Sequence, residues 1–270
     1  MKIALMDSGI GLLAAAAAVH RLRPDADLVL SCDPDGMPWG PRTPEDLTAR
    51  ALTVARAAAA HRPDALIVAC NTASVHALPA LRAALEPGVP VIGTVPAIKP
   101  AAAGGGRVAI WATPATTGSA YQRGLIRDFA DGAEVTEVPC PGLADAVEQA
   151  DEDAIDRTVA AAAALTPMDV RAVVLGCTHY ELVAERIRAA VSAGRPDGLG
   201  PVVLHGSAGA VAAQALRRAD AQPAPAAAPN TRLTVLLSGQ EGALPRPALA
   251  YAEGRLLATA NAVDPVTPAR

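Results

Sequence analysis

The chain has 270 residues, of which 51% are hydrophobic and 19% charged, which is typical of a compact folded protein and excludes a disordered one. The net charge is −4 and no dense stripe of lysine and arginine occurs, so we expect no nucleic-acid partner. We also expect no membrane span, because no uncharged apolar stretch reaches about 18 residues. The four cysteines are widely spaced, without a CxxC or Cys/His metal pattern, which predicts a cytoplasmic protein with no metal site.

Apolar β-branched runs alternate with helical runs through most of the chain. The predicted strands are Ile3–Met6, Leu28–Ser31, Leu66–Ala69, Val91–Thr94, Val108–Ala112, Val135–Pro139, Val173–Leu175, Val202–Leu204 and Leu233–Ser238. The main predicted helices are Leu12–Val19, Thr43–Ala60, Ser74–Leu85, Ser119–Phe129, Asp153–Leu165 and Ala208–Arg218. This alternation predicts an α/β fold with doubly wound parallel sheets. For the helix at Thr43, we expect that residue as N-cap, followed by Pro44 at the first helical position.

Two cysteines stand where buried strands end. Cys70 follows the apolar run Ala65–Val68, and Cys177 follows Ala172–Leu175 after one glycine. Open α/β sheets bind their ligands at the carboxyl ends of such strands. The matched positions therefore predict a site built from two similar α/β lobes, with one thiol on each side of a cleft.

Two facing thiols can remove a proton from one face of a carbon atom and return a proton to the other face. The ionised fraction of a free thiol is small at neutral pH, and His179 beside Cys177 would raise it. Neutral donors such as Asn71, Thr72 and Thr178 suit a substrate carboxylate that gains charge in the transition state. Pyridoxal chemistry needs a Schiff-base lysine, and Lys99 is the only internal lysine, so we expect no cofactor.

Other candidate residues lie at further loops. Asp7 and Ser8 follow the first strand, where Asp7 would either cap the next helix or take part in the site. The loop of residues 37–42 includes Trp39 and Gly40. Cys32 and Cys140 lack flanking donors, so we expect them to be structural.

Five motifs, in this order, resemble those of bacterial glutamate racemases. They are Asp7-Ser8-Gly9-Ile10-Gly11, Pro38-Trp39-Gly40, Ala69-Cys70-Asn71-Thr72-Ala73-Ser74, Gly93-Thr94-Val95-Pro96-Ala97-Ile98-Lys99-Pro100 and Leu175-Gly176-Cys177-Thr178-His179-Tyr180. The resemblance covers residues 2–257. It implies cofactor-independent racemisation of glutamate by two cysteines, which supplies the D isomer for peptidoglycan.

The resemblance also implies roles for individual residues and an organisation for the chain. The implied catalytic residues are Cys70, Cys177, Asp7, His179 and Glu148, and the implied substrate contacts are Asp7, Ser8, Trp39, Gly40, Asn71, Thr72, Thr178 and His179. One lobe would comprise residues 1–98 and 207–260, and the other residues 99–206. We expect residues 261–270 to form a disordered tail. A homodimer is expected, with a small amino acid as the substrate.

The chain departs from the family pattern at several positions. Leu12 stands in place of a glycine, Trp39 in place of a tyrosine and Glu181 in place of a proline. A loop that normally carries an Asp-Ser pair reads His205-Gly206-Ser207. Because Trp39 lies where the side-chain carboxylate is expected, its bulk and its different donor predict a tighter or altered pocket.

Three alternatives stay open at this point. The first is a sister racemase of the same superfamily, acting on aspartate or a hydantoin. The second is a hydrolase or acyl transferase that uses a Cys177–His179 pair and forms a thioester. The third is a binding protein that keeps the fold and has no activity.

Overall fold

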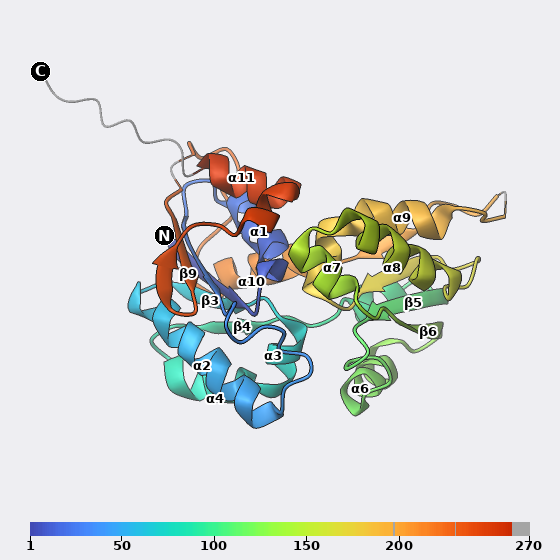
Figure 1. Cartoon of the computed structure of the whole chain (residues 1–270), viewed down its shortest axis with the longest axis horizontal. Coiled ribbons are helices and arrows are strands. Elements are labelled where there is room, and N and C mark those ends of the chain that lie inside the picture. Colours follow the sequence, from blue (N-terminus) through green and yellow to red (C-terminus); the bar gives the residue numbers. More distant parts are fainter. Residues whose placement is uncertain (197, 230, 261–270) are drawn as a thin grey trace, which may run out of the picture.

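Two sheets, one in each of two lobes, organise the molecule, and all of their strands are parallel except β10 (Figure 1). The computed structural model describes residues 1–196, 198–229 and 231–260. Within these residues, the sheet of lobe A has the strand order β10-β9-β2-β1-β3-β4 and the sheet of lobe B has the order β6-β5-β7-β8. The strands of lobe A are β1 (Lys2–Asp7), β2 (Asp27–Cys32), β3 (Ala65–Val68), β4 (Val91–Gly93), β9 (Leu233–Leu237) and β10 (Gln240–Gly242). Those of lobe B are β5 (Gly106–Ala112), β6 (Ala133–Pro139), β7 (Ala172–Leu175) and β8 (Val203–His205).

Helices cover the faces of both sheets. Lobe A has α1 (Leu13–Leu22), α2 (Pro44–Ala60), α3 (Asn71–His76), α4 (Leu78–Leu85), α10 (Ala208–Arg218) and α11 (Ala252–Ala260). Lobe B has α5 (Ile98–Ala102), α6 (Ala120–Phe129), α7 (Leu143–Gln149), α8 (Glu152–Ala164) and α9 (Ala184–Ser192). The described residues also form three 3-10 helices, which are η1 (Ile10–Leu12), η2 (Thr178–Val183) and η3 (Arg246–Ala250). The central strands β3 and β7 are buried along their whole length, because helices lie over both faces.

Local sequence chemistry explains several helix ends. The hydroxyl of Thr43 accepts a hydrogen bond of 3.3 Å from the backbone N–H of Asp46, and Pro44 begins α2, so the predicted N-cap is confirmed. The single helix predicted over residues 74–85 is wrong, since the chain forms α3 and α4 instead. Pro79 lies in the first turn of α4, where its ring and its missing N–H interrupt a continuous helix.

The sheet of lobe A differs from the prediction at one edge. The predicted strands are all parallel, whereas β10 pairs antiparallel with β9. Gln240–Gly242 contains no apolar run from which a strand could be predicted. The predicted tail at residues 261–270 lies outside the described residues.

One apolar cluster runs through both lobes. It includes Ile3 and Leu5 of β1 in lobe A, and Trp111 of β5 and Val173 of β7 in lobe B. Tyr180 of η2 belongs to the same cluster and is fully buried. The lobes are therefore packed on each other through a common core rather than joined by linkers alone.

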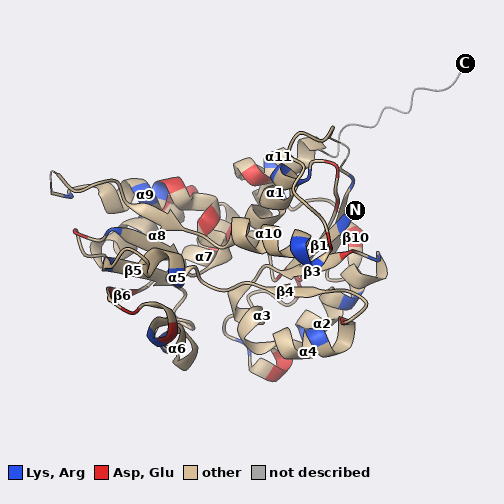
Figure 2. Ribbon diagram, turned by 180° about the vertical axis from the view of Figure 1, so that it is seen from behind, with Lys and Arg blue, Asp and Glu red and all other residues tan. Residues whose placement is uncertain are grey.

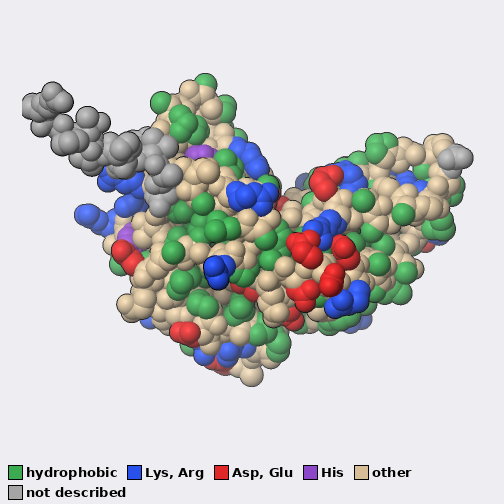
Figure 3. Space-filling view, turned by 45° about the horizontal axis from the view of Figure 1, so that its top comes forward, with side chains coloured by type: hydrophobic (Ala, Val, Ile, Leu, Met, Phe, Trp, Pro, Cys, Tyr) green, Lys and Arg blue, Asp and Glu red, His purple; other side chains and the backbone are tan. Residues whose placement is uncertain are grey.

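The surface is mixed in charge. Over the described residues of the face in Figure 3, basic side chains lie interspersed with acidic ones, and a notch separates the two lobes. On lobe B, Arg186 of α9 pairs with Glu152 and Asp156 of α8. Among the described helices, none has the length and apolar character that crossing a bilayer requires.

Candidate active site

The carboxyl ends of strands from both sheets surround a cavity of about 380 Å³. Residues after β1 and β3 line it from lobe A, and residues after β5, β6 and β7 line it from lobe B. The cavity contains every site residue predicted from the sequence: Asp7, Ser8, Trp39, Gly40, Cys70, Asn71, Thr72, Glu148, Cys177, Thr178 and His179. The fold thus brings together segments that lie far apart in the sequence.

The two cysteines occupy equivalent positions in the two lobes. Cys70 is the N-cap residue of α3, with φ −141° and ψ 120°, and Cys177 is the N-cap residue of η2, with φ −137° and ψ 136°. One residue separates each cysteine from the strand before it. The backbone N–H of that residue donates a hydrogen bond to a carbonyl oxygen of the neighbouring strand, from Ala69 to Met6 in lobe A and from Gly176 to Trp111 in lobe B. Both thiols are free and line the same cavity. The two lobes thus each contribute one free thiol to a single cavity.

Cys70 lies beside a buried carboxyl group. Asp7 is 1% exposed, and its Oδ1 accepts a hydrogen bond of 2.7 Å from the N–H of Ser8. Its Oδ2 has no hydrogen-bond partner among the described residues. Burial raises the pKa of Asp7 to about 6, although the positive charge of His179 opposes the shift. Burial, with the negative charge of Asp7, also raises the pKa of Cys70 well above its usual value, so that sulfur holds its proton at neutral pH.

Asp7 does not cap the following helix. The N-cap residue of η1 is Gly9 and that of α1 is Leu12, and neither helix has a side-chain cap. Asp7 instead lines the same cavity as Cys70. A buried carboxyl group with a raised pKa beside a thiol is suited to exchanging protons with it.

Cys177 lies beside a histidine that is held by a glutamate. His179 Nδ1 is 3.8 Å from the sulfur of Cys177, and its Nε2 is 2.8 Å from Oε2 of Glu148. Burial lowers the pKa of His179, but hydrogen bonding to Cys177 and Glu148 and nearby negative charge raise it well above its usual value. We therefore assign His179 as an imidazolium at neutral pH, which favours negative charge on a neighbouring sulfur.

Glu148 also links the two lobes. Its Oε2 accepts a hydrogen bond of 2.8 Å from the backbone N–H of Ile10, on η1 of lobe A, while Glu148 itself belongs to α7 of lobe B. A Cβ atom at Gly9 would lie 2.1 Å from the same oxygen, so only glycine allows this close approach. At Gly11, a Cβ atom would lie 2.3 Å from Oδ2 of Asp7 and 2.6 Å from Nδ1 of His179. The motif between Asp7 and Leu12 thus leaves room for side chains of both lobes.

Neutral groups supply the hydrogen-bond donors around the cavity. Among the described lining residues there is no lysine or arginine, and Ser8, Thr72 and Thr178 offer hydroxyl groups. Asn71 Nδ2 donates a hydrogen bond of 2.8 Å to the carbonyl oxygen of Gly176, and its Oδ1 has no partner among the described residues. Carboxylates in this cavity would be held by neutral donors and by His179.

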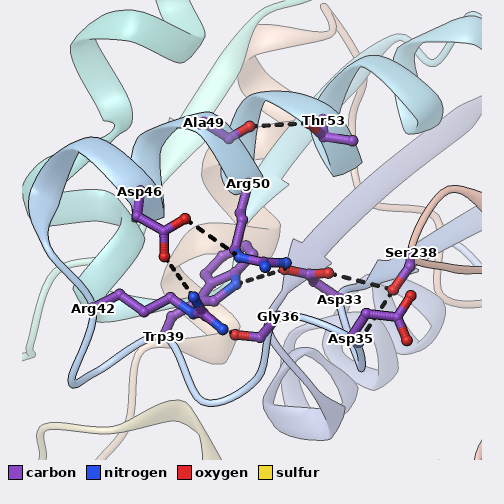
Figure 4. A network of polar contacts seen from close by, with 10 residues as sticks. All are labelled: Asp33, Asp35, Gly36, Trp39, Arg42, Asp46, Ala49, Arg50, Thr53 and Ser238. Atoms are coloured by element: carbon purple, nitrogen blue, oxygen red, sulfur yellow. Dashed lines mark hydrogen bonds and ion pairs between the residues drawn. The ribbon is translucent and has the colours of Figure 1, made fainter.

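Trp39 lines the cavity, and its indole N–H points toward Asp33 (Figure 4). The indole Nε1 donates a hydrogen bond of 2.9 Å to Oδ2 of Asp33, which is 4% exposed. Asp33 also pairs with Arg50 at 3.5 Å and accepts a hydrogen bond of 3.3 Å from Ser238. The donor that distinguishes Trp39 from tyrosine is therefore used within the loop. What the ring presents to a substrate is an apolar surface beside Gly40.

Sequence reasoning missed the partner of Trp39 and the lining segment that follows β6, which comprises Cys140, Pro141, Gly142, Ala144 and Asp145. Cys140, expected to be structural, and Asp145 both line the cavity after β6. Cys140 directly follows a strand, which is the same signal that identified Cys70 and Cys177. Its pKa is raised to about 12 by burial, so it stays protonated. The role of Asp33 had no sequence signal, because its bond to Trp39 depends on how the loop folds.

Comparisons with known proteins support the interpretation of this cavity as the active site of a racemase. The profile of the Asp/Glu/Hydantoin racemase family matches residues 11–216. A glutamate racemase of Roseiflexus sp. (strain RS-1) is 38% identical over 192 residues, which are 69% of this chain and 70% of that protein. A glutamate racemase of Vibrio campbellii is 38% identical over 194 residues, 70% of this chain and 72% of that protein.

Solved structures match over nearly the whole chain. The crystal structure of Escherichia coli glutamate racemase, in complex with L-glutamate and the activator UDP-MurNAc-ala, has a TM-score of 0.74 at 26% identity and covers 96% of this chain and 94% of that one. The glutamate racemase of Thermus thermophilus, in complex with beta-chloro-D-alanine, has a TM-score of 0.65 at 27% identity and covers 95% and 92%. With the profile match and the curated relatives, these similarities show that the chain belongs to the Asp/Glu/Hydantoin racemase family.

Proposed function

We propose that this protein interconverts L- and D-glutamate without a cofactor, with Cys70 and Cys177 as the two bases. The observation that carries the proposal is that both thiols, at equivalent N-cap positions in the two lobes, line one cavity of about 380 Å³. Glutamate is supported by the curated relatives, which are glutamate racemases, and by the E. coli structure, which contains L-glutamate.

Substrate binding relies on neutral donors. In this proposal Asn71, Thr72 and Thr178 hold the α-carboxylate, and the loop with Trp39 and Gly40 lies against the side-chain carboxylate; all five residues line the cavity. The α-proton is many pKa units less acidic than a thiol, and each unit corresponds to about 1.4 kcal/mol. Fixed donors that strengthen as charge grows on the carboxylate, in a cavity that excludes water, lower this cost.

The proton path follows from the different surroundings of the two sulfurs. Cys70 begins as a thiol, and Cys177, 3.8 Å from Nδ1 of His179, acts as the base. The sulfur of Cys177 removes the α-proton from one face, and the thiol of Cys70 gives its proton to the opposite face, which inverts the carbon. Afterwards Cys177 holds a proton and Cys70 lacks one. In this state the opposite enantiomer reacts with the roles of the two cysteines exchanged. Passage of one proton from Cys177 to Cys70 through solvent, with Asp7 beside Cys70 and His179 beside Cys177, restores the first state.

The test is exchange of the α-proton in deuterated water, followed by NMR, with L- and D-glutamate as substrates. Replacing either Cys70 or Cys177 with alanine should lower racemisation by about a thousandfold or more, because each removes an essential acid–base group. Cys140→Ala is the matched control, since this thiol lines the same cavity but has no role in the path. Full activity in either of the first two variants would refute the assignment.

A second candidate substrate is aspartate, and the observation that favours it is the wall formed by Trp39. The ring is 1% exposed and cannot turn its N–H toward a side-chain carboxylate while it is bonded to Asp33. A panel of L- and D-amino acids in the same exchange assay separates the two. A higher kcat/KM for aspartate than for glutamate would replace glutamate as the substrate.

A thiol hydrolase is the candidate from another reaction class. Cys177, His179 and Glu148 form a chain of contacts that would also suit attack on an acyl group. That reaction needs a thioester on Cys177 and does not need Cys70. Mass spectrometry of the protein after incubation with thioester and amide substrates tests this, and an acyl adduct on Cys177 would favour it.

We further propose that the enzyme acts in the cytoplasm as a homodimer and supplies D-glutamate for peptidoglycan. Four free cysteines are typical of a reducing compartment. The dimer and the peptidoglycan role rest on the resemblance to bacterial glutamate racemases. Cell fractionation and light scattering on the purified chain test location and oligomeric state.

A further inference from the structure

Glu181 occupies an unusual place between the two lobes. It lies on η2, the short helix that begins after Cys177 and carries His179. Its Oε1 accepts hydrogen bonds from the backbone N–H of Ser207 at 2.8 Å and from the hydroxyl of Ser207 at 2.9 Å. The N–H of Ala208 lies 3.3 Å from both carboxylate oxygens. A single side chain thus binds the start of another helix through several donors.

These donors belong to the N-terminus of α10. Ser207 is the N-cap residue of that helix, and its own side chain makes no capping hydrogen bond. The first N–H groups of a helix have no partner within the helix and need an acceptor from elsewhere. The carboxylate of Glu181 supplies it, and its negative charge is favourable at this end of the helix dipole.

The contact joins the two lobes next to a catalytic segment. The chain leaves lobe B at β8 and enters lobe A at α10, which packs against α1 and β3 (Figure 2). The helix η2 follows β7 of lobe B. Glu181 therefore fastens the segment of Cys177 and His179 to the point where the chain re-enters lobe A. Tyr180, the preceding residue, anchors η2 within lobe B by a bond of 3.3 Å to the carbonyl of Cys140.

Gly206 is part of the same arrangement. A Cβ atom at this position would lie 2.4 Å from Oε2 of Glu181, so the carboxylate fills the space that a side chain at 206 would need. Both positions are ones where the chain departs from the family pattern, and the structure shows them in contact. The two departures form one interaction.

We propose that Glu181 is a positioning residue for racemisation, which holds the Cys177–His179 segment at its place in the cavity by fixing η2 to the start of α10. The inference rests on the proposed function, because it assigns to Glu181 an effect on the Cys177 half of that reaction. A misplacement of about 1 Å in a catalytic group can cost a hundredfold in rate, so the effect is measurable.

The experiment compares Glu181→Ala with a variant that restores a carboxylate at the N-terminus of α10 but does not connect that helix to η2. Glu181→Ala should lower Tm by a few degrees and kcat by about tenfold to a hundredfold, with a smaller change in KM. Adding Gly206→Asp places a carboxylate in the space that Glu181→Ala vacates, on the α10 side. Gly206 does not have the left-handed backbone conformation that favours glycine, so its backbone accepts an aspartate. In Glu181→Ala/Gly206→Asp we expect Tm to recover and kcat to stay low.

Two further variants serve as controls. Glu181→Gln keeps an acceptor oxygen and should keep most of the activity. Glu185→Ala removes an exposed carboxylate on α9 and should change neither Tm nor kcat.

A second readout separates positioning from general destabilisation. The two enantiomers have equal free energy in water, so kcat/KM must fall by the same factor in both directions. The primary deuterium isotope effect on kcat/KM, measured with 2-deuterated L- and D-glutamate, should rise only for the enantiomer whose α-hydrogen Cys177 removes. A uniform loss of folded protein would leave both isotope effects unchanged.

Recovery of kcat together with Tm in the double variant would overturn the proposal, as would wild-type kinetics in Glu181→Ala. The proposed function can fail separately, if the wild-type protein exchanges the α-proton of no amino acid. In that case the rate at which iodoacetamide alkylates Cys177, followed by mass spectrometry, tests whether Glu181 positions the Cys177 segment. A slower rate in Glu181→Ala that Gly206→Asp does not restore supports positioning, and an unchanged rate refutes it.

Discussion

Asn71 and Gly176 are joined by a hydrogen bond of 2.8 Å, from the side-chain amide of one to the carbonyl oxygen of the other. The bond connects the residue after Cys70 to the residue before Cys177, so the loops that carry the two cysteines are tied directly to each other. Asn71 is 6% exposed, and water does not compete freely for this contact. The structure therefore represents the two lobes closed around the cavity.

Replacing Asn71 with aspartate should open this connection. The change preserves shape, but it puts a carboxylate oxygen against the carbonyl oxygen of Gly176 and removes the donor. We expect kcat/KM for glutamate to fall about a hundredfold, because two loops lose their mutual position and a substrate donor is lost. Steady-state kinetics in both directions measure this, and Asn71→Ser, which keeps a short donor, should lose less.

Asp7 should make stability depend on pH in a way opposite to that of most carboxyl groups. Its pKa is about 6 in the folded protein and 3.8 in the unfolded chain, so the folded protein binds the proton more tightly. The free energy of unfolding then falls as pH rises from 4 through 6, by roughly 2 to 3 kcal/mol. Asp7→Asn should abolish this dependence and raise stability at pH 8, while racemisation is lost.

Urea denaturation of both proteins between about pH 4 and pH 8 checks the sign. Asp25→Asn is the control of opposite sign. A hydrogen bond from Arg23 lowers the pKa of Asp25 to about 2, so removing that charge should reduce stability at neutral pH. A pH dependence that survives in Asp7→Asn would contradict the assignment.

Glu148→Gln should shift the alkaline limb of the pH profile. Glu148 helps raise the pKa of His179, and without its charge the imidazolium loses its proton at lower pH. The decline of kcat/KM at high pH should therefore begin earlier in the variant. Profiles measured for wild type, Glu148→Gln and Glu152→Gln test this, since Glu152 is a surface residue paired with Arg186. An unchanged limb in Glu148→Gln would show that His179 does not carry that titration.

Trp39→Phe should change both stability and substrate binding. The variant removes the donor to buried Asp33, which costs about 1 to 3 kcal/mol. The freed ring no longer fixes the cavity wall, so KM for glutamate should rise several-fold. Trp111→Phe is a matched control, because Trp111 is buried and donates to Thr166 at 2.9 Å but does not line the cavity. It should lose similar stability with unchanged KM, and equal KM shifts in both variants would count against a role for the wall.

Two glycines should respond in opposite ways to alanine. Gly11→Ala forces a methyl group to within 2.6 Å of Thr178 Oγ1 and closer to Asp7, so we expect loss of activity and a stability cost of about 1 to 3 kcal/mol. Gly209→Ala, in α10, meets nothing within 4 Å and should raise stability by about 0.5 to 1 kcal/mol. Urea denaturation and the exchange assay measure the two effects. Normal activity in Gly11→Ala would mean that the close approach is not required.

The strands and the cysteine loops could be predicted because their signals are local. Runs such as Ala65–Val68 are apolar on both faces, and Cys70 and Cys177 each follow such a run after one residue. β10 could not be predicted, since Gln240–Gly242 pairs through its backbone alone. The break between α3 and α4 carried a signal in Pro79, which outweighs the helical pattern around it.

The contacts that complete the site depend on how the lobes pack. Glu148 meets Ile10, and Glu181 meets Ser207, only because two separate sheets come together. No spacing rule links such pairs. The hydrogen bond from the indole N–H of Trp39 to Asp33 could not be predicted for another reason. The loop folds back on itself, and the sequence does not show which way the indole ring turns.

The apolar cluster shared by both lobes bears on how the molecule comes apart. Because Ile3 and Val173, from different sheets, belong to the same cluster, separating the lobes would expose the interior of each. Heating should thus melt both sheets in a single cooperative step, and a fragment comprising either lobe alone would aggregate rather than fold. Motions that admit substrate must accordingly be small rotations that keep this interior dry.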